Sequence, residues 1–225
     1  FLSCAQSFFN IVNKQIFIIG SGFSSLSAAC YLSKKGYNVS VFEKNKNFGG
    51  RARQFESDGF TFDMGPSWYW MPDVFERFFN DFGKKVSDLY ELKKLNPAYR
   101  VVFDKNSQFE IEDNINSIVK LFEKHEKGSG KKLESFMKEA KDNYDLAVTN
   151  MLYKMPGLSP LELVNSKTIA KANLFITNIK KQIEKRFKNH KLRSILQFPV
   201  LFLGAKPSNT PAFYNFMNYA DFGLG

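Results

Sequence analysis

The fold is decided by residues 15–25, which read QIFIIGSGFSS. The first five are apolar and rich in β-branched side chains, which is typical of a buried parallel strand. Gly20 and Gly22 follow at once. Residues 23–35 then have the apolar spacing of a helix, and residues 38–42, NVSVF, form a second predicted strand. The order of strand, glycine turn, helix and strand predicts a βαβ unit.

The glycine turn has the composition of a phosphate-binding turn. Gly20 suits a tight turn, and Gly22 lets the backbone approach a pyrophosphate closely. The N-terminus of the following helix offers free N–H groups and the positive end of the helix dipole. The third glycine of the common motif is replaced by Ser25, which is small enough to keep helix and strand packed. The predicted phosphate-binding residues are Gly20, Ser21, Gly22, Phe23, Ser24 and Ser25.

An acidic residue stands where a dinucleotide ribose would be bound. Glu43 ends the second predicted strand, 23 residues after Gly20. A carboxylate at this position typically accepts hydrogen bonds from the ribose hydroxyls. We therefore place Glu43, with the adjacent Lys44, in a dinucleotide-binding site.

Two further loops carry glycines that suit the same site. Gly49 and Gly50 would bring a second loop close to the pyrophosphate, and Arg51 can neutralise phosphate charge with two parallel hydrogen bonds. A third segment, residues 58–67, contains Gly65, Pro66 and Ser67. Its glycine and proline predict a rigid backbone that lies against a flat ring. We expect residues 45–70 as a whole to form a long functional loop.

These motifs together resemble a known family. The run from Ile18 through Pro66 is similar to the N-terminus of the flavin amine-oxidase and carotenoid-desaturase superfamily. Residues 64–73, MGPSWYWMPD, and residues 202–214, FLGAKPSNTPAFY, resemble phytoene desaturases of the bacterial and fungal type. The resemblance covers residues 14–225 without an obvious gap.

The resemblance implies FAD as cofactor and an α/β fold. In such proteins a Rossmann-like FAD-binding domain, built from both ends of the chain, carries an inserted α+β substrate domain. We expect an N-terminal extension over residues 1–13, the first part of the FAD-binding domain over residues 14–95, and a truncated substrate domain over residues 96–225. The chain by itself is then expected to be inactive.

The implied reaction is the introduction of double bonds into phytoene or a related polyene, with hydride passing to flavin N5. A long hydrocarbon offers no polar handle, so its site would be an apolar tunnel. No catalytic acid or base and no metal site can be named. The electron acceptor also stays unassigned, because the cofactor carries most of the chemistry.

Alternatives remain open at this point. Another carotenoid or isoprenoid flavin oxidoreductase, such as a hydroxycarotenoid or dehydrosqualene desaturase, would share the same motifs. A non-enzymatic prenyl-lipid-binding relative of the same fold is a rival from another class. The intact Gly20, Gly22, Glu43 and Gly50-Arg51 argue against the non-enzymatic alternative.

The later part of the chain is mostly helical and strongly basic. Residues 100–103 and 108–111 predict a hairpin. Of the net charge of +10, residues 120–200 carry +9, from 17 Lys and Arg against 8 Asp and Glu. Residues 175–193 predict an amphipathic basic helix with the apolar row Phe175, Ile179, Ile183 and Phe187. This row either meets an anionic membrane surface or packs into the core and leaves only lysines outside.

The cysteine content and the absence of targeting signals indicate the cellular location of the protein and the kinds of partner to expect. Cys4 and Cys30 make no disulfide framework, and Cys30 is predicted to be a small buried side chain. No segment has the pattern of a signal peptide or a membrane span. We therefore expect a cytoplasmic protein that associates peripherally with membranes and does not bind nucleic acid. The 25 phenylalanines favour either ordinary core packing or an aromatic-lined cavity for an apolar substrate.

Overall fold

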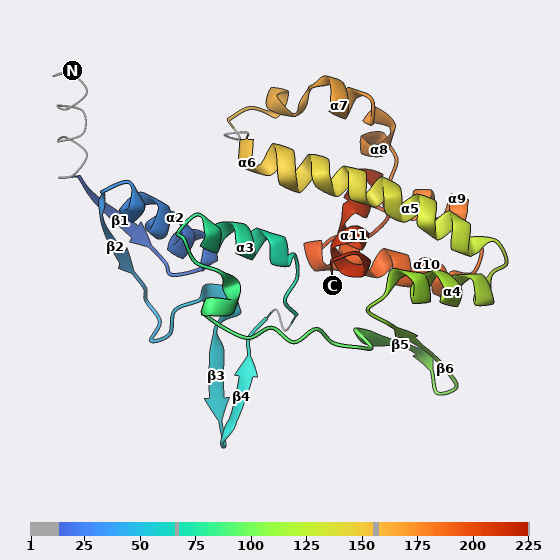
Figure 1. Cartoon of the computed structure of the whole chain (residues 1–225), viewed down its shortest axis with the longest axis horizontal. Helices are drawn as coiled ribbons and strands as arrows, with labels where there is room; N and C mark the ends of the chain where they lie inside the picture. The colour runs from blue at the N-terminus through green and yellow to red at the C-terminus, as the bar shows by residue number, and fades with distance from the viewer. Residues whose placement is uncertain (1–13, 66–67, 155–157, 225) are drawn as a thin grey trace. The chain divides into compact units, whose positions relative to one another are not determined.

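The computed structural model describes residues 14–65, 68–154 and 158–224, and it divides the chain into two compact units, residues 1–69 and 70–225 (Figure 1). The predicted boundary at residue 95 stays a prediction of domain organisation. The predicted N-terminal extension, residues 1–13, lies outside the described residues.

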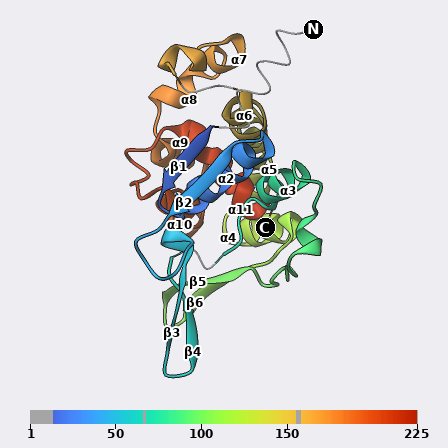
Figure 2. The same cartoon turned by 90° about the vertical axis from the view of Figure 1, so that its left-hand side faces the viewer.

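The first unit begins with the predicted βαβ motif. Strand β1 (Gln15–Ile19) pairs in parallel with β2 (Asn38–Phe42), in a register that sets Gln15 opposite Asn38 and Ile19 opposite Phe42. Helix α2 (Phe23–Lys34) connects the two strands and lies alongside them in both views (Figures 1 and 2). The Rossmann-like α/β prediction is therefore confirmed by the order, direction and bounds of these elements.

The segment predicted as one long loop contains a hairpin. After the 3-10 turn η1 (Gly50–Ala52), strands β3 (Gln54–Ser57) and β4 (Phe60–Asp63) pair antiparallel. Their connection is the dipeptide Asp58-Gly59, with φ of 52° and 81° at its two residues. Asp-Gly between alternating apolar residues is a strong hairpin signal, because both positions of the favoured turn need positive φ. The loop prediction was wrong over residues 54–63 for this reason.

The apolar residues of the first unit are largely exposed. Among its described residues only Ser21 is buried, while Ile19 is 89% exposed and Phe42 is 55% exposed. Cys30 is exposed too, so the prediction that it is a buried side chain was wrong. The reason is that α2 packs beside only two strands and buries no residue fully.

The second unit is mainly helical. Its first part contains α3 (Pro72–Asn80), the 3-10 turn η2 (Val86–Asp88), and the predicted hairpin, seen as β5 (Tyr99–Asp104) and β6 (Ser107–Ile111). Helices α4 (Ile115–His125) and α5 (Ser129–Tyr144) follow, and α5 continues into a π-helical segment η3 (Asp145–Met151). Short elements come next: α6 (Leu152–Lys154), η4 (Pro160–Leu163), α7 (Ser166–Ile169) and α8 (Ala172–Ile176). The last elements are α9 (Ile179–Arg186), α10 (His190–Gln197), η5 (Phe198–Leu203), η6 (Ala212–Asn215) and α11 (Phe216–Phe222).

The largest of three apolar clusters in this unit contains Phe109, Phe122, Phe136 and Phe187 among its buried side chains. It is built from the β5–β6 hairpin, α4, α5, α9 and α10. Phe187 lies at its centre, with ring centroids 5.8 Å from Phe122 and 6.4 Å from Phe136, both edge-on. All three rings are fully buried, so for them core packing explains the abundant phenylalanine.

The predicted basic helix over residues 175–193 is broken into three pieces. Helix α8 ends at Ile176, α9 spans Ile179–Arg186, and α10 begins at His190. Asn178 and Asn189 cap the starts of α9 and α10 through their side chains, and such asparagine caps favour a helix start over a continuing helix. Ile179, Ile183 and Phe187 are fully buried, so the alternative in which the row packs into the core is confirmed for these three residues. Phe175 is 41% exposed and stacks on Phe213.

Candidate dinucleotide-binding site

The turn between β1 and α2 has the backbone that the motif predicts. Gly20 has a φ of +93°, which favours glycine, and its N–H donates to the carbonyl of Phe42 at 2.7 Å. Gly22 is the N-cap of α2, with an ordinary extended backbone and no side chain that caps the helix. Backbone N–H groups at such a helix start carry the positive end of the helix dipole, which favours an anionic ligand.

The backbone conformation of Gly22, unlike that of Gly20, does not favour glycine. Its φ of −72° is open to any residue, and a Cβ added there would meet nothing within 4 Å. Neither its backbone conformation nor packing against the described residues therefore demands glycine at this position.

The second glycine loop lies directly against this turn. The N–H of Gly49 donates to the Ser21 carbonyl at 2.9 Å, and Gly22 and Gly49 form an isolated parallel bridge. Gly50 has a φ of +62°, and a Cβ on it would lie 3.1 Å from the Cα of Gly22. Only glycine fits such a contact between two backbones without displacement.

The third segment joins the same cluster through Gly65. A Cβ on Gly65 would come within 2.4 Å of the Arg51 carbonyl oxygen, and its φ is +115°. The neighbouring Met64 N–H donates to the Arg53 carbonyl at 2.8 Å. The structure thus brings Gly65 beside the Gly50–Ala52 turn, while the predicted site residues Pro66 and Ser67 lie outside the described residues.

Glu43 is held across the glycine turn. Its Oε2 accepts from the backbone N–H of Ser21 at 2.8 Å and from the Ser21 hydroxyl at 2.7 Å. Its Oε1 accepts from the backbone N–H and the side-chain amide of Asn45, at 2.9 and 2.7 Å. These donors, with the Asn45 N–H the largest contributor, lower the pKa of Glu43 from 4.5 to about 2. The side chain is therefore a fixed carboxylate at neutral pH.

Most of the other predicted site residues are exposed side chains, and the sequence analysis did not identify one hydrogen-bond partner of Glu43. Lys44 and Arg51 are exposed, Phe23 is 59% exposed, and Ser24 and Ser25 lie in the first turn of α2. Sequence reasoning missed Asn45, which supplies two of the four donors to Glu43. The available signal was an Asn two residues after an acid at a strand end, a pattern that commonly closes a local turn.

Fold and site together define a dinucleotide-binding protein of the Rossmann-like class. A family model described as an NAD(P)-binding Rossmann-like domain matches residues 18–82. Among curated proteins, a carotenoid 3,4-desaturase of Haloarcula japonica is 39% identical over 218 residues, which are 96% of this chain and 44% of that protein. A 4,4'-diapophytoene desaturase of Staphylococcus aureus strain Newman is 32% identical over 213 residues, or 94% of this chain and 42% of that protein.

The chain is thus similar over nearly its whole length to a carotenoid desaturase and a diapophytoene desaturase, which agrees with the resemblance predicted from the sequence motifs. The chain spans less than half the length of these curated relatives. Solved structures agree on the fold. A putrescine oxidase variant gives a TM-score of 0.55 at 16% identity, covering 93% of this chain and 42% of that one. A fatty acid isomerase from P. acnes gives 0.56 at 18% identity, covering 94% and 44%.

Proposed function

We propose that the protein is an FAD-dependent carotenoid desaturase that introduces double bonds into phytoene or a related polyene. The observation that carries the proposal is the meeting of three glycine turns around Gly22, in a chain that is 39% identical over nearly its whole length to a carotenoid 3,4-desaturase. Bound FAD supplies the two-electron acceptor that removal of two hydrogens from a carbon–carbon single bond requires.

The residues present fit a dinucleotide of this kind. The space above Gly22 and the uncapped start of α2 suit the pyrophosphate, and exposed Arg51 can add positive charge. Close approach of Gly50 to Gly22 keeps this part of the loop free of side chains. None of these features identifies the substrate.

Glu43 is assigned to the ribose of the adenosine half. A carboxylate has about four acceptor positions, and Ser21 and Asn45 fill four. Two of these donors are backbone N–H groups, which hold the carboxylate in place. The other two are the Ser21 hydroxyl and the Asn45 amide, and we expect ribose hydroxyls to replace these rotatable donors when the dinucleotide binds.

The substrate reaches the enzyme from a membrane in this proposal. The part of the chain that the structure describes has no helix with both the length and the hydrophobicity needed to cross a bilayer. Exposed lysines on α9 and just after it, Lys181, Lys185 and Lys188, support a peripheral contact with an anionic surface. The buried Ile179, Ile183 and Phe187 take no part in it, so the contact is electrostatic.

One experiment distinguishes the proposed function from two alternatives, another carotenoid oxidoreductase and a non-enzymatic lipid-binding protein. The gene that encodes this chain would be expressed in a colourless host that makes either a 30-carbon or a 40-carbon acyclic polyene precursor. We expect the purified protein to be yellow with bound flavin, and one of the hosts to accumulate a coloured product with more conjugated double bonds. Colour from a hydroxylated carotenoid precursor alone would favour another carotenoid oxidoreductase. Protein without flavin, and colourless cells throughout, would favour the non-enzymatic lipid-binding relative and contradict the proposal.

A further inference from the structure

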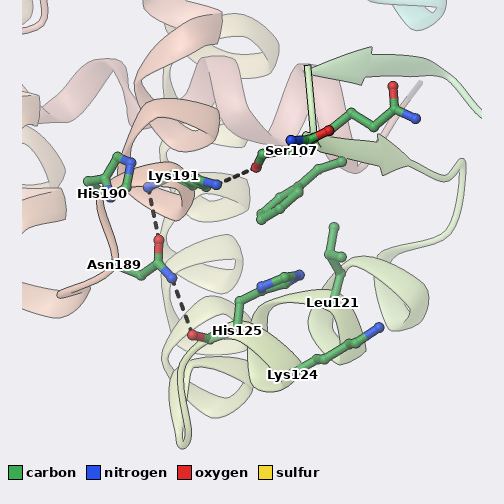
Figure 3. A pocket seen from close by; sticks show the side chains of 10 residues that line it. Ser107, Leu121, Lys124, His125, Asn189, His190 and Lys191 are labelled. Atoms are coloured by element: carbon green, nitrogen blue, oxygen red, sulfur yellow. Dashed lines mark hydrogen bonds between the residues drawn. The ribbon is translucent and has the colours of Figure 1, made fainter. Parts of the chain in front are cut away.

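A pocket of about 440 Å³ lies in the second unit. It is lined by the turn and second strand of the β5–β6 hairpin, the last turn of α4 and the first turn of α10 (Figure 3). Its volume is within the range of sites that bind small molecules. The proposed function leaves this pocket without a role.

The lining of the pocket is cationic. It includes Lys124, His125, His190 and Lys191, and none of the lining residues carries a carboxylate. His125 and His190 are also the only two histidines of the chain, so both imidazoles of the protein lie at one site.

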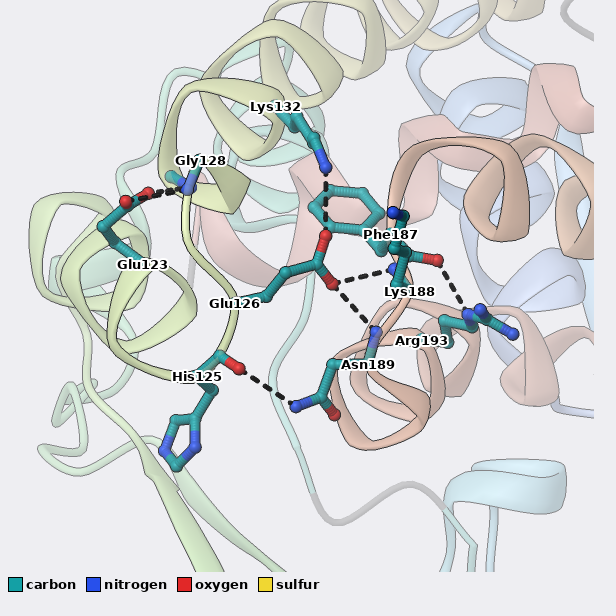
Figure 4. Close-up of polar contacts among 10 residues, drawn as sticks. Glu123, His125, Glu126, Gly128, Lys132, Phe187, Lys188, Asn189 and Arg193 are labelled. Carbon is teal, nitrogen blue, oxygen red and sulfur yellow. Dashed lines mark hydrogen bonds and ion pairs between the residues drawn. The ribbon is translucent and has the colours of Figure 1, made fainter.

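Nearby carboxylates are already engaged by other donors. Glu126 accepts from Lys132 Nζ at 3.0 Å and from the backbone N–H groups of Lys188 and Asn189, both at 2.8 Å (Figure 4). Glu123 accepts from the backbone N–H groups of Gly128 and Gly130, at 2.8 and 2.9 Å. Among the ion pairs of the described residues, none includes Lys124 or Lys191. Within the part of the chain that the structure describes, no ion pair therefore neutralises these two lysines.

The same contacts hold the walls of the pocket in position. Glu126 ties the end of α4 to the start of α10, and the Asn189 side-chain amide donates to the His125 carbonyl at 3.2 Å. Lys191 Nζ donates to the Ser107 hydroxyl and so links α10 to the hairpin (Figure 3). A site whose groups are held before binding loses less conformational freedom when a ligand arrives.

One wall is aromatic. The His125 ring stacks on Phe109 with centroids 4.3 Å apart and an interplanar angle of 25°. Leu121 extends this wall on α4. The pocket thus combines cationic groups for an anion with an apolar surface for the organic part of the same ligand.

We propose that this pocket binds a phosphate ester, with Lys124 and Lys191 around the phosphate and the Phe109–His125 stack against the ester group. Lysine is a common phosphate-binding residue in proteins. The ester comes either from a soluble metabolite or from the headgroup of an anionic phospholipid, and the experiment separates the two.

The histidines provide a direct readout. Partial burial, followed by the positive charges of Lys124 and Lys191, lowers the pKa of His125. The groups that face it in the pocket are Lys124, His190 and Lys191. A bound phosphate dianion opposes their effect, and we expect the pKa of His125 to rise by about one unit.

The test is histidine side-chain NMR of the intact protein during titration with glycerol phosphate, at constant ionic strength set with chloride. We expect saturable shifts of both imidazoles and the rise in the His125 pKa. Lys124→Gln with Lys191→Gln should weaken binding at least about tenfold. Lys120→Gln with Lys84→Gln removes the same charge from exposed positions of the second unit outside the pocket, and should leave binding within about twofold.

The second arm identifies the source of the ester. Vesicles of phosphatidylcholine with and without phosphatidic acid are added in place of glycerol phosphate. Histidine shifts with phosphatidic acid vesicles that glycerol phosphate reverses indicate a lipid headgroup, while shifts with glycerol phosphate alone indicate a soluble ester; either result supports the site. Unchanged histidine signals in both arms, or equal losses in the two double variants, would overturn it. The readout does not involve flavin, so this proposal and the proposed function fail independently.

Discussion

At the scale of single residues, the glycines around Gly22 serve different purposes. Gly50 and Gly65 are required by the folded chain itself, because each has positive φ and each would bring a Cβ against another backbone. Gly22 has neither constraint. In the proposed function a glycine is needed there for the pyrophosphate, so substitutions at Gly22 and Gly50 should have different consequences.

We expect Gly22→Val to abolish flavin binding and to leave the flavin-free protein folded. The valine would occupy the space assigned to the pyrophosphate, while its backbone and surroundings tolerate a side chain. Flavin absorbance after purification measures the first effect, and urea unfolding of flavin-free protein measures the second.

Gly50→Val is the matched comparison, since the same side chain at φ +62° and 3.1 Å from Gly22 Cα must displace backbone. We expect it to destabilise even the flavin-free protein, by roughly 1–3 kcal/mol. Normal flavin occupancy in Gly22→Val would show that this turn does not hold the pyrophosphate.

At the scale of elements, α11 and β5 are joined by a buried acid. Tyr99 in β5 donates its hydroxyl to Asp221 in α11 at 2.7 Å, and Asp221 is 8% exposed. Burial raises the pKa of Asp221 from 3.8 to about 6, although the Tyr99 hydrogen bond opposes this. The folded state therefore holds a carboxylate that would ionise more readily in the unfolded chain.

The consequence is a stability penalty at neutral and basic pH. Because the folded pKa lies above the unfolded one, the penalty is absent below about pH 3.8, grows up to pH 6 and is complete above it. Asp221→Asn should remove this dependence on pH. The change in the free energy of unfolding caused by the substitution should therefore be more favourable at pH 8 than at pH 4, by roughly 3 kcal/mol.

Urea unfolding at several pH values measures this difference. Tyr99→Phe serves as the contrasting variant, because it leaves the carboxylate buried without its donor and should destabilise most at pH 8. Parallel pH profiles for Asp221→Asn and the parent protein would contradict the assignment.

At the scale of the whole molecule, charge is concentrated in one part of the chain. Residues 120–200 carry +9 of the net +10, and the apolar residues between their lysines lie largely in the core. Attraction between such a surface and anionic lipid is screened beyond roughly 10 Å at 0.1 M salt. Membrane contact through this surface should therefore depend strongly on ionic strength.

We expect co-sedimentation with anionic vesicles at low salt and its loss as salt rises. The triple variant Lys181→Gln, Lys185→Gln, Lys188→Gln should bind more weakly, because each basic residue near an anionic surface contributes on the order of 1 kcal/mol. A charge-matched control changes Lys84, Lys93 and Lys105, which are exposed and lie outside the basic stretch. Equal binding by the two triple variants would reject α9 and the residues after it as the docking face.

The sequence by itself determined the local backbone of the candidate site. Strands β1 and β2 and helix α2 lie where the apolar pattern and glycine turn predicted them, because period and turn chemistry are properties of neighbouring residues. The β5–β6 hairpin was predicted for the same reason. The β3–β4 hairpin was just as local, but its Asp-Gly signal was overlooked within a glycine-rich stretch.

Only the tertiary structure decided which side chains meet. The burial of Ile183 and Phe187 depends on partners from α4 and α5, and no pattern within residues 175–193 distinguishes a core from a membrane. The pocket between β6, α4 and α10 joins residues up to 85 positions apart, and α2 and β2 lie in the chain between Gly22 and Gly50. The periodicity of apolar residues specifies which face of a helix or strand is buried, whereas packing between elements specifies what that face contacts. The cationic pocket of this chain results from packing between elements.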